Sequence, residues 1–373
     1  MMIYFDIACL AVFACSAIIC AVLILTKDFH MRDKGDDAGA VQSAHAAPTP
    51  RIGGVAIGVG LIVSIFLVPS AIQHTYALFV VSLTPVFMAG LAEDLGYEVS
   101  PRWRLIAAAL SSLLAIVLLE VWVARADVPG VDWLLGFVPL AVVFTMFATA
   151  GVCNAFNLID GLNGLSSGTG IITALGLAAV AHLAGQAQLA SISFMLIAVL
   201  MGFLVFNFPW GKIFLGDAGA YSLGHTLAWF SVILMFRVPE LSPWAVVLIF
   251  FWPLADTGFA MYRRRRSGRP TDQPDRLHFH QLVMRLLEIK YLGRGKRHIA
   301  NPLAALVMLP FVALPVGFGV LLWDKPFWAF FAVICFGGLF VGSYMLALRV
   351  AISTRGSSAQ GGRKGGFAFG PAE

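Results

Sequence analysis

Residues 189–207 have the sequence LASISFMLIAVLMGFLVFN, in which no side chain is charged. A helix needs about 20 predominantly apolar residues to cross the roughly 30 Å hydrocarbon core of a bilayer. The run does not alternate between apolar and polar positions, as the strands of a membrane barrel do. It therefore predicts a membrane-spanning helix, because only helices and closed barrels satisfy their backbone hydrogen bonds in lipid.

Further runs of this kind lie on both sides of the first. The chain has 373 residues, of which 59% are hydrophobic and 12% are charged. Soluble domains have roughly 45–50% apolar and about 25% charged residues, so a soluble enzyme, a disordered chain and a DNA-binding domain are excluded. The sequence predicts an all-α polytopic membrane protein with about eleven transmembrane helices. Their approximate positions are 3–25, 52–72, 76–92, 105–124, 132–152, 165–184, 189–207, 218–236, 243–262, 301–323 and 326–348.

The basic residues predict the orientation of these helices. If the N-terminus lies outside, 22 of the 25 lysine and arginine residues fall on the cytoplasmic side, and only Arg125, Arg237 and Lys325 face outward. Cytoplasmic loops are enriched in these residues, so the C-terminus is expected in the cytoplasm. This bias explains the net charge of +5 without a nucleic-acid partner.

The predicted helices form a single transmembrane domain over residues 1–350. Residues 351–373 are a Gly-rich cytoplasmic tail that we expect to be disordered. The cytoplasmic loops are expected at 26–51, 93–104, 153–164, 208–217 and 263–300.

Carboxylates, amides and imidazoles gather in these cytoplasmic loops. A distribution on one side favours a reaction at that surface, whereas a transporter places its polar groups near the bilayer midplane. The first such group is Glu93-Asp94. Adjacent carboxylates can bind a divalent cation, and their repulsion can raise the pKa of one enough to make it a base. The alternative is a solvated helix end.

The third loop has the sequence NAFNLIDGLNG, in which Asn154, Asn157, Asp160 and Asn163 recur at every third position. On a helix, neighbours at this spacing project to a similar side, so the four could line a site for a metal, a sugar or a nucleobase. The alternative is a polar turn, because Asn, Asp and Gly favour turns.

The fourth loop has the sequence FNFPWGKIFLGDAG and includes Asn207, Phe214 and Asp217. Asp217 could cap the helix that follows, or it could bind Mg²⁺, which prefers oxygen ligands and substrate phosphates. Phe214 is either an interface aromatic or a platform for a nucleobase.

The fifth loop ends in PDRLHFH, with Arg276, His278 and His280 close together. In an extended segment the two histidines point to the same side, and arginine binds phosphate with two hydrogen bonds. Together the three residues predict a phosphate site. Asp256 lies seven residues before Arg263, about 10 Å deep in its span. It is either functional, as intramembrane carboxylates often are, or a structural partner for Ser or Thr on another helix.

Five motifs follow one another along the chain, each in a predicted cytoplasmic loop. They are PTPRIGG (48–54), GLAEDL (90–95), NAFNLIDGLNG (154–164), FLGDAG (214–219) and PDRLHFH (274–280). In this arrangement the chain resembles the polyprenyl-phosphate N-acetylhexosamine-1-phosphate transferase family (glycosyltransferase family 4) over roughly residues 1–350. It resembles the WecA branch more than the MraY branch, which usually has ten spans and three consecutive histidines.

The resemblance implies transfer of a sugar-1-phosphate from a UDP-N-acetylhexosamine, or a UDP-N-acetyl deoxysugar, to undecaprenyl phosphate, with release of UMP. The product would initiate a bacterial cell-envelope polysaccharide such as O-antigen or capsule. The resemblance implies Mg²⁺ as cofactor, with Mn²⁺ as an alternative, and an active site on the cytoplasmic side of the inner membrane. It favours a homodimer. An MraY-like phospho-MurNAc-pentapeptide transferase and a lipid or anion transporter are the rival functions.

The resemblance also assigns roles to residues. Glu93 and Asp94 match the catalytic acidic pair, and Asn157 and Asp217 match metal-binding positions. Asp160, Asn163, Asn207 and Phe214 match nucleotide-binding positions, and Arg276, His278 and His280 match the diphosphate-binding loop. Further candidates are His45, Arg51, Asn154 and Asp256.

Two positions depart from the family pattern. The acidic pair is usually Asp-Asp and is Glu93-Asp94 here, and Asn163 stands where the family has Asp.

Overall fold

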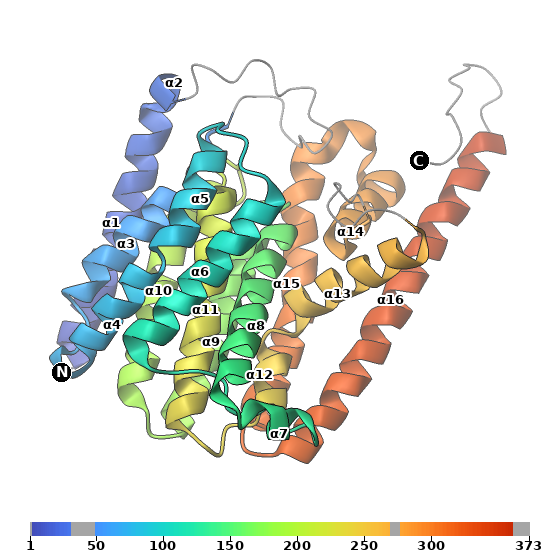
Figure 1. The fold of residues 1–373 in the computed structure, drawn as a ribbon. Helices are drawn as coiled ribbons and strands as arrows, with labels where there is room; N and C mark the ends of the chain where they lie inside the picture. Colours follow the sequence, from blue (N-terminus) through green and yellow to red (C-terminus); the bar gives the residue numbers. More distant parts are fainter. Residues whose placement is uncertain (1, 31–48, 269–276, 361–373) are drawn as a thin grey trace.

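The computed structural model describes residues 2–30, 49–268 and 277–360, and within these ranges it is a bundle of helices without a strand (Figure 1). The candidate residues His45 and Arg276 lie outside the described residues, as does the end of the predicted tail, 361–373.

Eight helices in the described chain are long and apolar enough to cross a bilayer. They are α1 (Met2–Leu25), α6 (Pro101–Leu119), α8 (Val138–Ile159), α9 (Leu165–Leu183), α10 (Ala187–Asn207), α11 (Gly216–Arg237), α15 (Arg297–Leu321) and α16 (Pro326–Gln360). This set of helices makes the chain a multi-pass membrane protein.

Two more predicted runs form pairs of helices with a bend between them. The helix α4 (Ser70–Ser82) meets α5 (Thr84–Asp94) at 42°, and α12 (Pro243–Ile249) meets α13 (Phe251–Arg266) at 83°. Counting each bent pair as one span raises the number of candidate spans from eight to ten.

The predicted number of about eleven spans is not confirmed by helix length, because one predicted run forms only a short helix. The run at 52–72 forms α3 (Gly54–Ile65), whose 12 residues extend about 18 Å at 1.5 Å per residue. That length is too short for a hydrocarbon core of roughly 30 Å. The chain leaves the helix before Pro69, since the residue ahead of a proline disfavours helical geometry.

The remaining helices are short and lie outside the candidate spans. They are α2 (Lys27–His30), α7 (Val131–Leu135), α14 (Phe279–Leu287), a π-helical turn at Glu288–Leu292 and a 3-10 turn at Arg294–Lys296.

The helix α11 lies in the middle of the bundle, where it packs against α8, α5, α3 and α9 (Figure 1). All of its residues from Gly216 to Leu234 are buried. A helix that is buried all round belongs to the interior, so the first turn of α11 needs partners from other helices for its polar groups.

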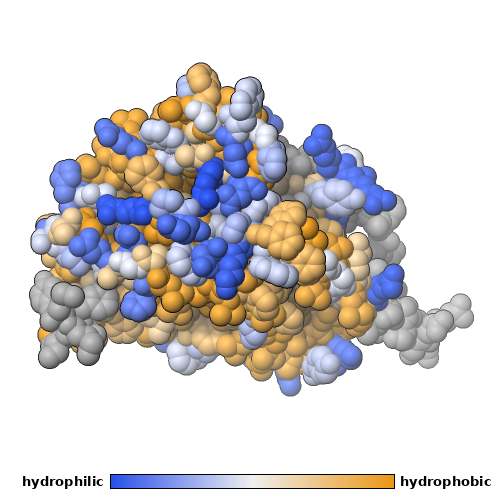
Figure 2. Space-filling view, turned by 90° about the horizontal axis from the view of Figure 1, so that it is seen from below, coloured by the Kyte–Doolittle hydropathy of each residue, from blue (hydrophilic) through white to orange (hydrophobic). Residues whose placement is uncertain are grey.

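The outer helices present apolar surfaces, as expected for contact with lipid. Only 17% of the apolar window of α16 and 22% of that of α1 is buried. Figure 2 shows the end of the bundle that is lower in Figure 1, where hydrophilic side chains gather across the middle and hydrophobic ones surround them. This pattern fits an end that meets water and sides that meet lipid.

The two ends of the described chain lie at opposite ends of the bundle. The helix α1 begins at the lower end in Figure 1, and α16 ends at the upper end. Ends on opposite sides need an odd number of crossings, as in the predicted topology, so one segment besides the ten candidate spans also runs between the two ends of the bundle. The identity of the cytoplasmic side stays a prediction. The helix α16 continues to Gln360, ten residues into the predicted tail.

Gly90→Ala tests the close approach of α5 to α11. A Cβ at Gly90 would lie 2.5 Å from the Cα and N atoms of Ala218, which are backbone atoms and cannot move aside easily. Overpacking of this kind costs about 1–3 kcal/mol, so we expect a lower melting temperature in detergent. Gly258→Ala on α13 is the control, because its Cβ would meet nothing within 4 Å. Equal melting temperatures for the two variants would contradict the packing described above.

Candidate active site

The predicted motifs come together where α5, α8 and α10 end and α11 begins. Hydrogen bonds join residues that are far apart in the sequence, such as Asp94 to Asp217 and Asn163 to Asn301.

Asp94 holds this first turn. Its Oδ1 accepts a hydrogen bond from the backbone N–H of Asp217 at 2.8 Å, and its Oδ2 accepts one from the N–H of Ala218 at 2.9 Å. The first N–H groups of a helix lack partners within the helix, and the helix dipole favours a negative charge there. Gly216 permits the approach, because its φ is +72° and a Cβ there would overlap the Asp94 carboxylate. Asp94 is thus a buried anchor of α11.

Glu93 differs from its neighbour. It is partly buried, and its Oε2 is buried without a hydrogen-bond partner among the described residues. A buried polar atom without a partner is costly, so Glu93 is the carboxylate of the pair that is available for a ligand.

Asp217 lies at the centre of the site. Its Oδ1 accepts a hydrogen bond from Nδ2 of Asn157 at 3.1 Å, and its Oδ2 forms an ion pair with Nη1 of Arg104. The structure therefore brings together Asn157 and Asp217, the two predicted metal-binding residues. Arg104 was not among the site residues predicted from the sequence. The available signal was a basic residue that follows the acidic pair in the same loop.

The spacing of the polar residues in the third loop predicted one helical face. The structure contradicts this prediction. Asn154 and Asn157 lie on α8, but this helix ends at Ile159. Asp160 follows with φ −78° and ψ 63°, so the chain turns away before Asn163. Gly161 and Gly164 favour this turn. Asn154 accepts a hydrogen bond from the Tyr221 hydroxyl at 3.4 Å, which keeps it beside α11.

Asp160 faces a basic residue from the first loop. Burial raises the pKa of Asp160 to about 7, and the positive charge of Arg51 partly offsets this effect. A carboxylate that is protonated near neutral pH lacks sufficient positive charge around it. A cation beside Asp160 would therefore be favourable when the carboxylate is charged, and a hydrogen-bond acceptor of a ligand would be favourable when it is protonated.

Asn163 and Asn207 use their side chains to hold loops. Asn207 accepts a hydrogen bond from the N–H of Gly164 at 2.7 Å and donates to the carbonyl of Ile213 at 2.8 Å. Asn163 donates to the carbonyl of Pro209 at 2.9 Å. These two predicted nucleotide-binding residues therefore join the third loop to the fourth.

Asn301 on α15 completes this connection. It is buried, and its Oδ1 accepts a hydrogen bond from the N–H of Asn163 at 2.8 Å. No motif signalled this residue, which lies within a predicted span.

Phe214 lies in the chain segment that pairs with the first loop. Its N–H donates to the carbonyl of Pro50, and its carbonyl accepts from the N–H of Gly53, both at 2.9 Å. The side chain is partly buried. These bonds fix the backbone of the fourth loop beside Arg51.

His278 and His280 lie together, although the segment is not extended throughout as predicted. His278 has extended geometry and precedes α14, whereas His280 belongs to the helix. The ring centres are 5.7 Å apart. Asp256 accepts a hydrogen bond from Nδ1 of His278 at 2.9 Å, so the partner of Asp256 is a histidine rather than the Ser or Thr that the sequence suggested as one alternative.

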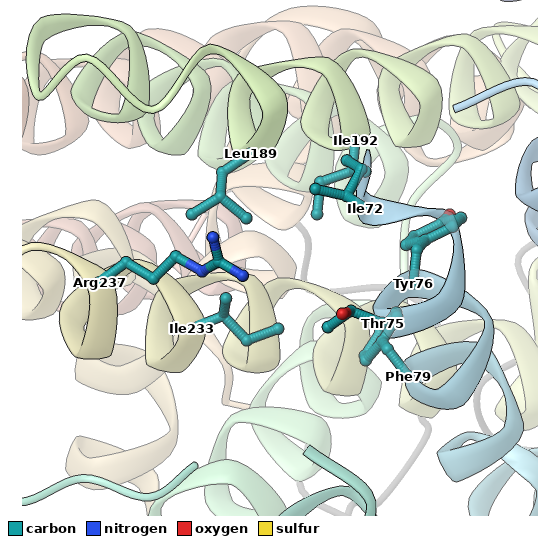
Figure 3. Close-up of a pocket in the computed structure, with 8 residues that line it drawn as sticks. All are labelled: Ile72, Thr75, Tyr76, Phe79, Leu189, Ile192, Ile233 and Arg237. Carbon is teal, nitrogen blue, oxygen red and sulfur yellow. The ribbon is translucent and has the colours of Figure 1, made fainter. Parts of the chain in front are cut away.

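Figure 3 shows a cavity that lies away from this site. It is lined mainly by apolar side chains of α4, α10 and α11, and the guanidinium of Arg237 reaches into it (Figure 3). Arg237 ends α11, about 30 Å along the helix from Asp217 at 1.5 Å per residue. We assign this cavity no role in the chemistry of the site.

The residues around Asp217 fit a magnesium ion bound together with a phosphate ligand. The described residues contain no cluster of three or more His, Cys, Asp or Glu side chains with metal-binding geometry. Mg²⁺ usually binds through one or two carboxylates and takes its other ligands from water and substrate phosphates. Asp217 and the adjacent amide of Asn157 supply such a set.

Comparison with known proteins gives consistent matches. The model for glycosyl transferase family 4 matches residues 75–235. The Bacillus subtilis protein named "Probable undecaprenyl-phosphate N-acetylglucosaminyl 1-phosphate transferase" is 28% identical over 70% of this chain and 74% of its own length. The Escherichia coli K12 undecaprenyl-phosphate alpha-N-acetylglucosaminyl 1-phosphate transferase is 27% identical over 65% of this chain and 66% of its own. The Mycobacterium tuberculosis decaprenyl-phosphate N-acetylglucosaminephosphotransferase is 31% identical over 68% and 69%.

Asp160→Asn tests the raised pKa of Asp160. With a pKa of about 7 when folded and 3.8 as its ordinary value, Asp160 binds its proton more tightly in the folded protein. Its contribution to stability is therefore fully present below about pH 4 and is lost as the pH rises toward 7. Between pH 5 and 8 we expect the melting temperature in detergent to fall more for the wild type than for Asp160→Asn. The control is Asp324→Asn, at an exposed aspartate, whose melting temperature should fall with pH as steeply as that of the wild type. An equally steep fall in Asp160→Asn would contradict the raised pKa of Asp160.

Proposed function

The chain belongs to glycosyl transferase family 4, and on this premise we propose that it transfers a sugar-1-phosphate from a UDP-N-acetylhexosamine to undecaprenyl phosphate. The products are undecaprenyl-diphospho-sugar and UMP. The main support for this proposal is that the acidic pair lies beside Asn157 and Asp217 at the start of α11. The names of the relatives favour N-acetylglucosamine as the sugar and give no support to the two rival functions.

The reaction is a displacement at the β-phosphorus of the UDP-sugar. An oxygen of the lipid phosphate forms a bond to this phosphorus while the bond to the bridging oxygen breaks, and that oxygen leaves with UMP. We assign Glu93 to orient the lipid phosphate and to accept its proton where one is present, because Glu93 retains an unpartnered oxygen. Both oxygens of Asp94 are occupied by the first turn of α11, so we assign Asp94 to position Asp217.

Asn157 and Asp217 would hold Mg²⁺, with Mn²⁺ as an alternative. When bound, the ion supplies electrostatic stabilisation for the negative charge that develops on the diphosphate. Arg104 already balances the charge of Asp217 in this structure. Its guanidinium is also suited to a phosphate oxygen, since arginine offers several donors in a planar fork.

The loops around this centre are assigned to the donor. Asp160 and Phe214 are placed at the nucleoside, and the histidine pair at the diphosphate. Arg51 faces Asp160 and adds positive charge on the side of the first loop. Asn163 and Asn207 shape this pocket through the loop contacts described above.

We place the reaction on the cytoplasmic side of a bacterial inner membrane, where UDP-sugars are available. The product would initiate a cell-envelope polysaccharide. The lysine and arginine distribution supports this orientation, and the family supports a homodimer as the working assembly.

Glu93→Gln and Asp94→Asn separate the roles of the two carboxylates. We expect Glu93→Gln to lose at least about 100-fold in kcat, because removal of a general base typically costs 10²–10⁴-fold. We expect Asp94→Asn to lose activity as well, because Asp94 positions Asp217 through the first turn of α11. Only Asp94→Asn should also lower the melting temperature, because loss of a helix cap costs about 1 kcal/mol. Activity and thermal stability in detergent provide the test. Normal activity in Glu93→Gln would contradict its assignment.

The reaction itself is tested with purified protein, undecaprenyl phosphate, Mg²⁺ and a panel of UDP-N-acetyl sugars. We expect release of UMP together with a lipid-linked sugar phosphate from at least one donor, and loss of both products in excess EDTA with recovery on adding Mg²⁺ or Mn²⁺. The control is Gly258→Ala, which should retain activity. Folded protein that releases no UMP with any donor would contradict the proposed function.

A further inference from the structure

Asp256 is a buried carboxylate whose two oxygens both have partners. It lies in α13, which begins just after the 83° bend, and its exposed fraction is 2%. Its Oδ2 accepts a hydrogen bond from Nδ1 of His278 at 2.9 Å, and its Oδ1 accepts one from the N–H of Phe279 at 3.0 Å. It also lies 3.9 Å from Nδ1 of His280. One carboxylate thus contacts three consecutive residues at the start of α14.

The ring of His280 faces the third loop, and the ring of His278 stacks beside it. The rings are nearly parallel, at 15° to each other, and both are buried. A Cβ at Gly161 would lie 2.6 Å from Nε2 of His280, so this nitrogen lies directly against the turn after Asp160. Glycine at this position is what allows the imidazole to approach the backbone.

The nitrogens of His280 have no hydrogen-bond partner among the described residues, although both are buried. Burial lowers the pKa of His280 to about 4, so the ring is neutral near pH 7. Leaving buried polar atoms unpaired costs free energy, and one such nitrogen faces the turn assigned to the donor. An incoming ligand with a polar group would supply the missing partner.

A second contact fixes the chain on the other side of His278. The carbonyl of Leu277 accepts hydrogen bonds from Nη1 of Arg263 at 3.0 Å and from the hydroxyl of Tyr344 at 2.9 Å. Residues 277–280 are therefore held from α13 and from α16 together. With the backbone fixed in this way, Asp256 acts chiefly on the orientation of the rings.

We propose that Asp256 is a positioning residue, which through His278 and Phe279 holds the His278–His280 pair against the turn at Gly161, where the diphosphate of the donor binds. This inference rests on the proposed function. A carboxylate that accepts a hydrogen bond from Nδ1–H of an imidazole fixes the ring orientation and the tautomer, and it leaves Nε2 for a ligand. A cap of α14 alone would need one oxygen, whereas Asp256 uses both.

The chemistry explains why a charged group is retained at this buried position. An isolated carboxylate is expensive to bury, but one that is paired and hydrogen-bonded is tolerated. Asp256 itself touches no substrate in this account, since its contacts are with the histidines and the backbone of α14. Its effect on the reaction therefore depends on the presence of His278.

The test is a double-mutant cycle between Asp256→Asn and His278→Ala, measured as kcat and KM for UMP release. Asparagine keeps the size of the side chain and an oxygen for the N–H of Phe279, but it reverses the hydrogen-bond polarity toward His278. We expect Asp256→Asn to lower kcat/KM by about 10- to 100-fold, as loss of supporting hydrogen bonds does at other sites. In the His278→Ala background the same change should cost less than about twofold, because coupled residues are not additive.

Thr257→Val is the matched control. Thr257 is the next residue of α13, it is buried, and its hydroxyl has no partner in the part of the chain that the structure describes. We expect this variant to retain wild-type kcat/KM within about twofold, as a change that removes no bonded partner should.

Three outcomes would overturn the inference. These are equal losses from Asp256→Asn with and without His278, activity of Asp256→Asn equal to that of Thr257→Val, and wild-type activity in His278→Ala. Should Asp256→Asn not fold, Asp256→Glu replaces it in the same cycle with the same expectations, because it keeps the charge and displaces it by one methylene. Absence of UMP release from the wild type would instead count against the proposed function.

Discussion

The contact between the Asp94 carboxylate and the first turn of α11 is the interaction on which the rest of the site depends. The helix α11 is buried along most of its length, so its first N–H groups cannot be satisfied by water. The partner comes from α5, 123 residues earlier in the chain. Because this contact fixes the start of α11, it also fixes the direction of the Asp217 side chain, which points toward Asn157 and Arg104. The proposed diphosphate site would need this degree of order before the ligand arrives.

The same principle recurs at two other places. Asn207 joins the third and fourth loops through two backbone groups, and Asp256 joins α13 to the start of α14. Within a membrane the hydrophobic effect does not drive helices together, so packing of small residues and hydrogen bonds between helices carry more of the specificity. In this chain, buried polar side chains hold the loops, and Glu93 and His280 nearby keep buried atoms without a hydrogen-bond partner among the described residues.

The positions of most helices and the loops that hold the site residues could be predicted from the sequence, because both depend on local patterns. Apolar runs locate the helices, and the polar loops between them contain the residues that the structure brings together around Asp217. What could not be predicted depends on contacts between distant residues. The side chain of Asn301 meets the backbone of Asn163 from 138 positions away, and no local pattern signals that pairing. The end of α8 at Ile159 and the short length of α3 were missed for a different reason, because local turn-forming residues compete there with an apolar pattern.

In the proposed reaction, the phosphorus next to the sugar moves with the sugar to the lipid. The most direct measurement uses UDP-N-acetylglucosamine labelled with radioactive phosphorus in the β position, incubated with the purified protein, undecaprenyl phosphate and Mg²⁺. The account predicts that the label appears in the lipid-linked product and that the released UMP carries none. Label that stays in released UDP, with an unlabelled glycolipid, would mean that the sugar moves without its phosphate and would contradict the account.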